Sequence, residues 1–116
     1  MRFIHEKIDL GYEDLVADTR PTGRTYITAD GSRYPSITTV LSILNEDAIA
    51  AWRKRVGEDE ANRVGQRAAN RGTSVHNIVE KYLSNEDTKD YLPHIKQSLE
   101  NLRPILDSRV GTIYGL

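Results

Sequence analysis

The sequence feature that most constrains the fold is a long run of helical periodicity over about residues 58–84. Apolar residues recur there at the three- and four-residue spacing that places side chains on one face of an α-helix. They are Ala61, Val64, Ala68, Val75, Ile78, Val79, Tyr82 and Leu83. Such a stripe is typical of an amphipathic helix that packs against other elements. The chain is therefore predicted to be mainly α-helical.

Three further segments carry helix signals. Ser36 is a suitable N-cap, because its hydroxyl can accept a hydrogen bond from a first-turn amide, and Gly57 is a natural stop. Pro104 should kink the last helix or end it early, because proline lacks the amide hydrogen that the helix needs. The predicted helices cover about residues 36–44, 47–56, 58–84 and 90–108.

A small β element is predicted before the helices. Asp30-Gly31 lies between short β-prone segments, and glycine accepts a positive φ at little steric cost, so we expect a β-hairpin at about residues 24–34. Residues 11–23 are polar and end in a loop signature, and residues 3–10 favour a short strand. The expected fold class is mainly α with a small β-hairpin.

Composition excludes several classes of protein. The chain has 116 residues, of which 38% are hydrophobic and 28% charged, with a formal net charge of -1, so no global basic field indicates a nucleic-acid binder. It has no cysteine, which excludes a disulfide framework and a cysteine zinc site. No apolar run approaches the ~20 residues of a membrane span. We expect a cytoplasmic protein without a membrane partner.

The stretch RGTSVHNIVEKYL places Gly72, His76 and Glu80 one helical turn apart. An imidazole and a carboxylate at this spacing can share a divalent cation, although two ligands are too few for a tight site. The alternative is structural: a partly buried His76 that is hydrogen-bonded to Glu80 or to a backbone carbonyl. Spacing alone leaves both open.

Two groups of basic residues are candidates for phosphate contacts. Arg63, Arg67 and Arg71 recur every four residues, on the far flank of the apolar stripe from His76. Their alternative role is a solvated face. Arg53 begins a short basic run after Trp52, which a rim of long side chains around a buried tryptophan would also explain.

Three stretches, GRTYITADGSRYPSITTVLSIL, WRKRVGEDEANRV and RGTSVHNIVEKYL, carry a family resemblance in this order and spacing. Together they resemble the N-terminal half of phage-type exonucleases in the PD-(D/E)XK superfamily, to which the mitochondrial genome maintenance exonuclease is similar. The resemblance covers about residues 20–116. It rests on the combination of motifs, since none of them is decisive alone.

The resemblance implies a restriction-endonuclease-like α/β fold in which acidic residues on neighbouring strands hold Mg²⁺ or Mn²⁺. It implies that His76 adds a ligand to that site, that Glu80 supports it, and that the segment around Ser36 lies near single-stranded DNA. The residues expected to contact nucleic acid are Ser36, Thr38, Arg53, Arg67, Arg71 and Thr73.

The sequence departs from the family in lacking the acid and acid-x-Lys strands. We therefore expect residues 1–116 to form a single partial domain, the helical N-terminal part of a metal-dependent DNA exonuclease. The parent enzyme would hydrolyse phosphodiester bonds, in a host cell if phage-encoded, whereas this chain alone would be inactive and bind no metal tightly. Two alternatives remain open: a self-contained helical DNA-binding or protein-interaction module without catalysis, and a structural fragment with no role alone.

One further expectation concerns association. The apolar faces of the third and fourth predicted helices would stay exposed if their covering sheet is missing, which favours a homodimer. Residues 110–116 would then be frayed or recruited into the dimer contact.

Overall fold

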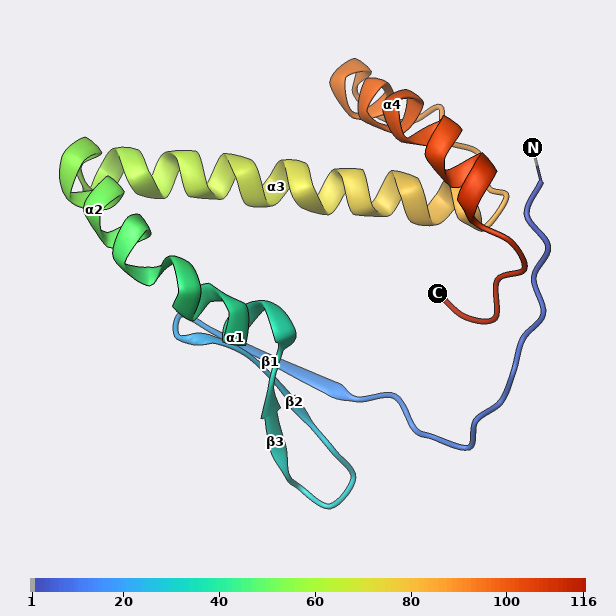
Figure 1. Cartoon of the computed structure of the whole chain (residues 1–116), viewed down its shortest axis with the longest axis horizontal. Helices are drawn as coiled ribbons and strands as arrows, with labels where there is room; N and C mark the ends of the chain where they lie inside the picture. The colour runs from blue at the N-terminus through green and yellow to red at the C-terminus, as the bar shows by residue number, and fades with distance from the viewer. Residues whose placement is uncertain (1) are drawn as a thin grey trace. The chain divides into compact units, whose positions relative to one another are not determined.

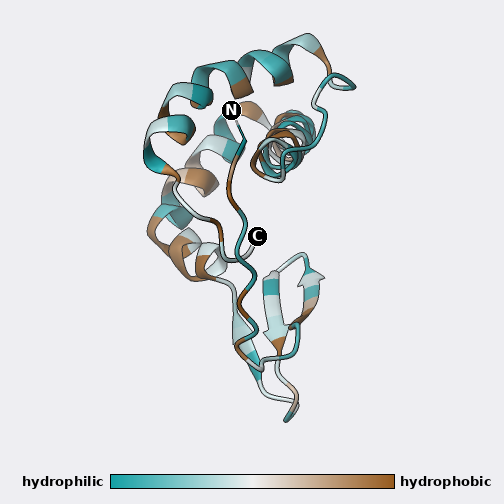
Figure 2. Ribbon diagram, turned by 90° about the vertical axis from the view of Figure 1, so that its right-hand side faces the viewer, coloured by the Kyte–Doolittle hydropathy of each residue, from teal (hydrophilic) through white to brown (hydrophobic). Residues whose placement is uncertain are grey.

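The computed structural model of the chain describes residues 2–116 and is mainly α-helical with a small antiparallel sheet (Figure 1), which confirms the coarse fold prediction. The restriction-endonuclease-like α/β fold that the resemblance implies is not seen among these residues, because their sheet is three short antiparallel strands. Its helices are amphipathic, with hydrophilic and hydrophobic stretches interleaved along them (Figure 2). The elements are β1 (Val16–Arg20), β2 (Gly23–Ile27), β3 (Arg33–Pro35), α1 (Ile37–Ser42), the 3₁₀ helix η1 (Ile43–Asn45), α2 (Glu46–Val56), α3 (Glu58–Leu83) and α4 (Pro93–Arg109).

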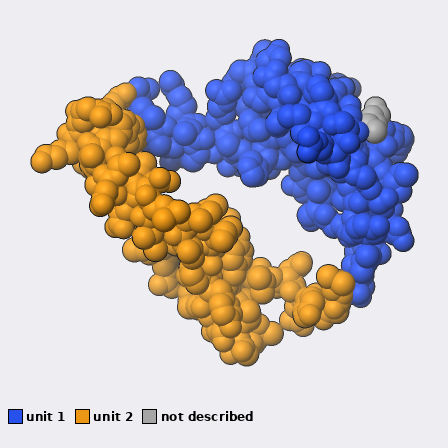
Figure 3. All heavy atoms as spheres, in the orientation of Figure 1, with its two compact units in different colours: residues 1–9, 62–116 blue, residues 10–61 orange. Residues whose placement is uncertain are grey.

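The described chain divides into two compact units, where the sequence suggests one partial domain (Figure 3). Unit 1 (blue in Figure 3) joins residues 2–9 to residues 62–116, and unit 2 (orange) is residues 10–61. The boundary falls inside α3. The cluster of buried hydrophobic side chains belongs entirely to unit 1, whereas most large apolar side chains of unit 2 are exposed.

The sheet of unit 2 has the strand order β1-β2-β3. The hairpin predicted at residues 24–34 is confirmed: β2 and β3 pair antiparallel, with Tyr26 opposite Tyr34. The loop between them closes where the Gly31 amide donates to the Thr28 carbonyl at 3.0 Å. Gly31 has φ +83°, the left-handed conformation that glycine permits most easily. The Asp30 carboxylate accepts from the Ser32 amide at 3.0 Å.

The prediction of a loop over residues 11–23 is wrong for its second half. Residues 16–20 form β1, which pairs with β2 through a two-residue turn at Pro21-Thr22. The strand was missed because Ala17 and Asp18, which are depleted in strands, interrupt the β-favouring Val16 and Thr19. Ion pairing supplies what propensity lacks, since Asp18 accepts from Arg33 of β3 at 2.8 Å and from Arg20 of its own strand at 2.9 Å. These hydrogen bonds, first Arg33 and then Arg20, lower the pKa of Asp18.

Helix α1 begins as predicted, with the Ser36 hydroxyl accepting from the Thr39 amide at 3.1 Å. It is shorter than expected and continues through η1 into α2, which ends at Gly57 with φ +91°. Four apolar side chains that give α1 and η1 their helical spacing stay exposed: Ile37, Val40, Leu41 and Leu44.

The core of unit 1 lies where α3 and α4 meet the two ends of the described chain. Its buried members are Phe3, Ile78, Tyr82, Ile95, Leu99 and Ile113. Phe3 and Tyr82 meet edge to face, with ring centroids 5.2 Å apart, and the Tyr82 hydroxyl donates to Asp107. Burial and this hydrogen bond raise the pKa of Tyr82. The apolar faces of α3 and α4 thus cover each other in part, with Val75, Val79 and Leu106 partly buried against this core. The homodimer stays a prediction.

Two local predictions in this unit need correction. Pro104 does not end α4, which continues to Arg109. Residues 3–10 form no extended strand, because pairing is limited to one parallel bridge between His5 and Ile113. The Ile113 amide donates to the Ile4 carbonyl at 2.8 Å, and the Ile113 carbonyl accepts from the Glu6 amide at 2.8 Å. The tail is therefore not frayed at Ile113, since the N-terminal segment is its partner.

The end of α3 is tied to the N-terminal segment by Asn85. This residue has φ +61°, and its amide donates to the Tyr82 carbonyl while the Glu86 amide donates to the Lys81 carbonyl, which is the Schellman pattern of helix termination. The Asn85 side chain accepts from the Phe3 amide at 2.6 Å and donates to the Phe3 carbonyl at 2.9 Å. One residue thus caps the helix and holds Phe3 in the core.

Candidate nucleic-acid interface

A groove of about 750 Å³ runs along the N-terminal half of α3 and reaches the start of α4. This groove lies within unit 1. Its walls carry three guanidinium groups, two amides, a hydroxyl and an imidazole, with two apolar side chains. The lining residues are Arg63, Gln66, Arg67, Asn70, Arg71, Ser74, Leu92, His94 and Ile95. We call it the arginine groove.

Arginine spacing in this groove follows from helix geometry. Positions four apart on an α-helix advance by ~6 Å and stay on one side, so Arg63, Arg67 and Arg71 form a row. Within residues 2–116, neither Arg67 nor Arg71 forms an ion pair, and both side chains are exposed. Their charge is therefore not neutralised by a carboxylate of the described chain.

Four polar members of the arginine groove were not predicted from the sequence: Gln66, Asn70, Ser74 and His94. Gln66 and Asn70 precede Arg67 and Arg71 by one residue, and the Gln66 amide donates to the Asn70 side chain at 2.9 Å. This repeated amide-arginine pair was a visible signal in the sequence. His94 had no such signal, because only the packing of α4 beside α3 brings it to the groove.

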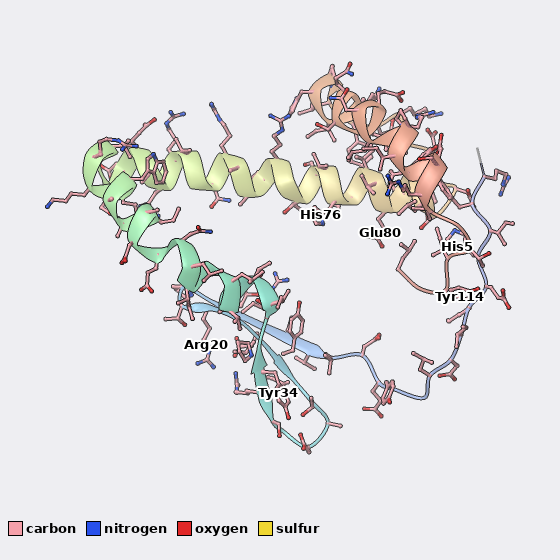
Figure 4. All side chains as sticks on the ribbon, viewed as in Figure 1. His5, Arg20, Tyr34, His76, Glu80 and Tyr114 are labelled. Atoms are coloured by element: carbon pink, nitrogen blue, oxygen red, sulfur yellow. The ribbon has the colours of Figure 1, made fainter. Side chains whose placement is uncertain are left out.

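His76 and Glu80 lie elsewhere on α3, as the helical spacing predicts. Both line a second groove, of about 380 Å³, whose other walls are apolar: Val75, Val79, Leu83, Leu102 and Leu116. Figure 4 shows the two side chains on the same side of the helix. Both are exposed, so the alternative of a partly buried His76 is wrong.

This pair does not make a complete metal site. No group of three or more His, Asp or Glu side chains placed to hold a metal ion occurs among residues 2–116. Hard divalent ions take about six oxygen ligands, whereas His76 and Glu80 supply one imidazole and one carboxylate.

Gly72 and Thr73 lie on exposed turns of α3. A Cβ built on Gly72 would meet nothing within 4 Å, and the same is true of Gly65, about two turns earlier in the helix. Within the described chain, no contact therefore requires glycine at position 72.

The remaining predicted DNA contacts belong to the unit of residues 10–61. Ser36 is buried, and its hydroxyl lies 3.2 Å from the Thr38 hydroxyl and 2.8 Å from the Thr39 hydroxyl. Arg53 pairs with Glu58 at 2.9 Å. These groups hold α1 and the start of α3 in place, whereas Thr38 itself is exposed.

No protein-family model, curated protein or solved structure matches the chain. In the part of the chain that the structure covers, every helix is too short or too polar to cross a bilayer.

Proposed function

We propose that this chain binds DNA through the arginine groove, as the helical part of a metal-dependent exonuclease of the PD-(D/E)XK kind. The observation that supports it is the gathering of Arg63, Arg67 and Arg71 with amide and imidazole groups along one face of α3. A row of guanidinium groups suits a phosphate backbone, because each carries several donors in a planar fork.

The groove explains how a chain of net charge -1 would bind a polyanion. Affinity for nucleic acid depends on local charge and on the counterions released when phosphates are neutralised. Neutral donors in the groove, Gln66 and Asn70, add contacts that do not depend on charge. Such contacts position a strand without reading its sequence.

The exonuclease part of the proposal rests on the family resemblance. His76 and Glu80 would add one imidazole and one carboxylate to a metal site completed by other acidic groups, on the opposite side of α3 from the arginine groove. When bound, Mg²⁺ or Mn²⁺ would stabilise developing charge and activate water. Because the described residues do not complete this site, no catalytic step is assigned to them.

A second candidate is a self-contained DNA-binding module without catalysis. It is favoured by the separation of the two grooves, since the arginine groove shares no lining residue with the groove of His76 and Glu80. In that case His76 is replaceable without any loss of DNA binding.

The test is fluorescence anisotropy of a labelled 20-nucleotide single strand, at several salt concentrations. We expect the double variant R67A/R71A to weaken binding at least tenfold and to reduce the salt slope by about two. The control is K54A/R55A, which removes two exposed charges of α2 that do not line the groove. If the two double variants bind DNA equally well, the proposed interface is wrong.

A further inference from the structure

One face of the small sheet gathers two tyrosines and an arginine. In the strand register, Tyr26 of β2 lies directly opposite Tyr34 of β3, and Thr19 of β1 lies opposite Arg24. Side chains two residues apart on a strand share a face, so Arg24 lies on the same face as both tyrosines. We call this the tyrosine face.

The opposite face of the sheet is committed to structural contacts. It carries Asp18, with its ion pairs to Arg20 and Arg33. It also carries Gly23, where an added Cβ would lie 2.6 Å from Thr39 of α1. The register and these contacts agree that α1 approaches β2 on that face. The helix contact at Gly23 therefore lies on the face opposite the two tyrosines.

Exposure shows that the tyrosine face is available. Tyr34 is 57% exposed, and Tyr26 beside it is partly buried. The Arg24 side chain is held on the strand, because its Nε donates to the Thr19 hydroxyl at 2.9 Å. Figure 4 labels Tyr34 on β3, at the edge of the sheet.

We propose that Tyr26, Tyr34 and Arg24 form a stacking platform for the unpaired bases of a single-stranded nucleic acid. Aromatic rings on an open surface stack with bases of any sequence, and a guanidinium beside them adds a cation for the phosphate or the base. A double helix does not fit this platform, because its bases already stack on each other. The inference rests on the proposed function and adds to it a second contact surface, which would hold bases rather than phosphates.

A neighbouring tyrosine pair also stabilises a hairpin, so the test must separate binding from folding. Three probes are compared on the wild-type chain: a thymidine 20-mer, its duplex with adenosine, and a 20-residue abasic strand. The abasic strand keeps the phosphates and lacks the bases. We expect the thymidine strand to bind about tenfold more tightly than either of the other two.

Variants of Tyr34 then locate the effect. Tyr34→Ala should weaken binding of the thymidine strand about tenfold and leave binding of the abasic strand unchanged. Tyr34→Phe, which keeps the ring, is the matched control and should bind as the wild type does. Far-UV circular dichroism checks that each variant is folded, and the wild-type comparison with the abasic strand decides the matter if Tyr34→Ala is not.

The outcomes distinguish this inference from the proposed function. Equal binding of the abasic and thymidine strands overturns the stacking platform. If R67A/R71A then weakens both probes alike, the arginine groove stands without the platform. Failure of all three probes to bind overturns both proposals.

Discussion

Asn85 offers the sharpest test of how this chain is held together. Its side chain makes two hydrogen bonds to the backbone of Phe3, and its own backbone has φ +61°. Replacing it with glycine removes both bonds but keeps a residue that accepts this φ. Replacing it with alanine removes both bonds and keeps a Cβ in the left-handed region without the polar side chain that lets asparagine adopt it.

The expected magnitudes follow from these contacts. Each lost hydrogen bond costs about 0.5–1.5 kcal/mol, so Asn85→Gly should lower the free energy of unfolding by about 1–3 kcal/mol. Asn85→Ala should cost about 1 kcal/mol more than that, because a non-glycine residue pays for the positive φ. In both variants Phe3 loses its anchor, so its edge-to-face contact with Tyr82 should weaken as well.

Urea unfolding followed by the helical circular dichroism signal gives these energies. Hydrogen exchange at the Ile113 amide reports locally, because this amide donates to the Ile4 carbonyl one residue beyond Phe3. It should exchange faster in both variants. If Asn85→Gly unfolds within about 0.5 kcal/mol of the wild type and Ile113 exchange is unchanged, the clamp contributes no stability.

Three further predictions concern unit 1, which contains α4 and most of α3. Gly72→Ala should stabilise α3 by about 0.5–1 kcal/mol in thermal unfolding, as should the matched Gly65→Ala, because an added Cβ meets nothing at either position; destabilisation by Gly72→Ala alone would contradict this. The raised pKa of Tyr82 contributes stability that is present below its unfolded pKa of about 10 and is lost as pH rises through the folded value. Between about pH 9 and 11 the wild type should therefore lose more stability than Tyr82→Phe, and equal losses would sink the idea. Manganese titration followed by the ring signals of His76 should show binding no tighter than about millimolar, since hard ions take about six ligands; saturable micromolar binding would reveal ligands beyond His76 and Glu80.

Local rules predicted the elements that local chemistry determines. The Ser36 cap, the stop at Gly57 and the turn at Gly31 follow from side-chain hydrogen bonding and glycine conformation, and all three are observed. Strand β1 could not be predicted this way, because Asp18 is stabilised by Arg33, a residue fifteen positions away. The continuation of α4 past Pro104 agrees with the helix predicted over about residues 90–108, and buried Ile95 and Leu99 fix that helix against the core.

The candidate site was predictable to the extent that it lies on one helix. Arg67, Arg71, His76 and Glu80 all belong to α3, so a constant rise and turn place them on its two sides without knowledge of the fold. His94 enters the arginine groove from α4, which depends on packing between helices. The tyrosine face depended on strand register, and a shift of one residue would have turned Tyr34 to the other face.

The contact between Phe3 and the region of Tyr82 and Ile113 also bears on biosynthesis. A ribosome releases Phe3 early and Ile113 more than a hundred positions later, so the first apolar residue of this core waits in the nascent chain for its partners. Closing so long a loop carries an entropic cost that grows with the logarithm of its length. This unit is therefore expected to fold only once Ile113 has left the ribosome, with Phe3 available to chaperones until then.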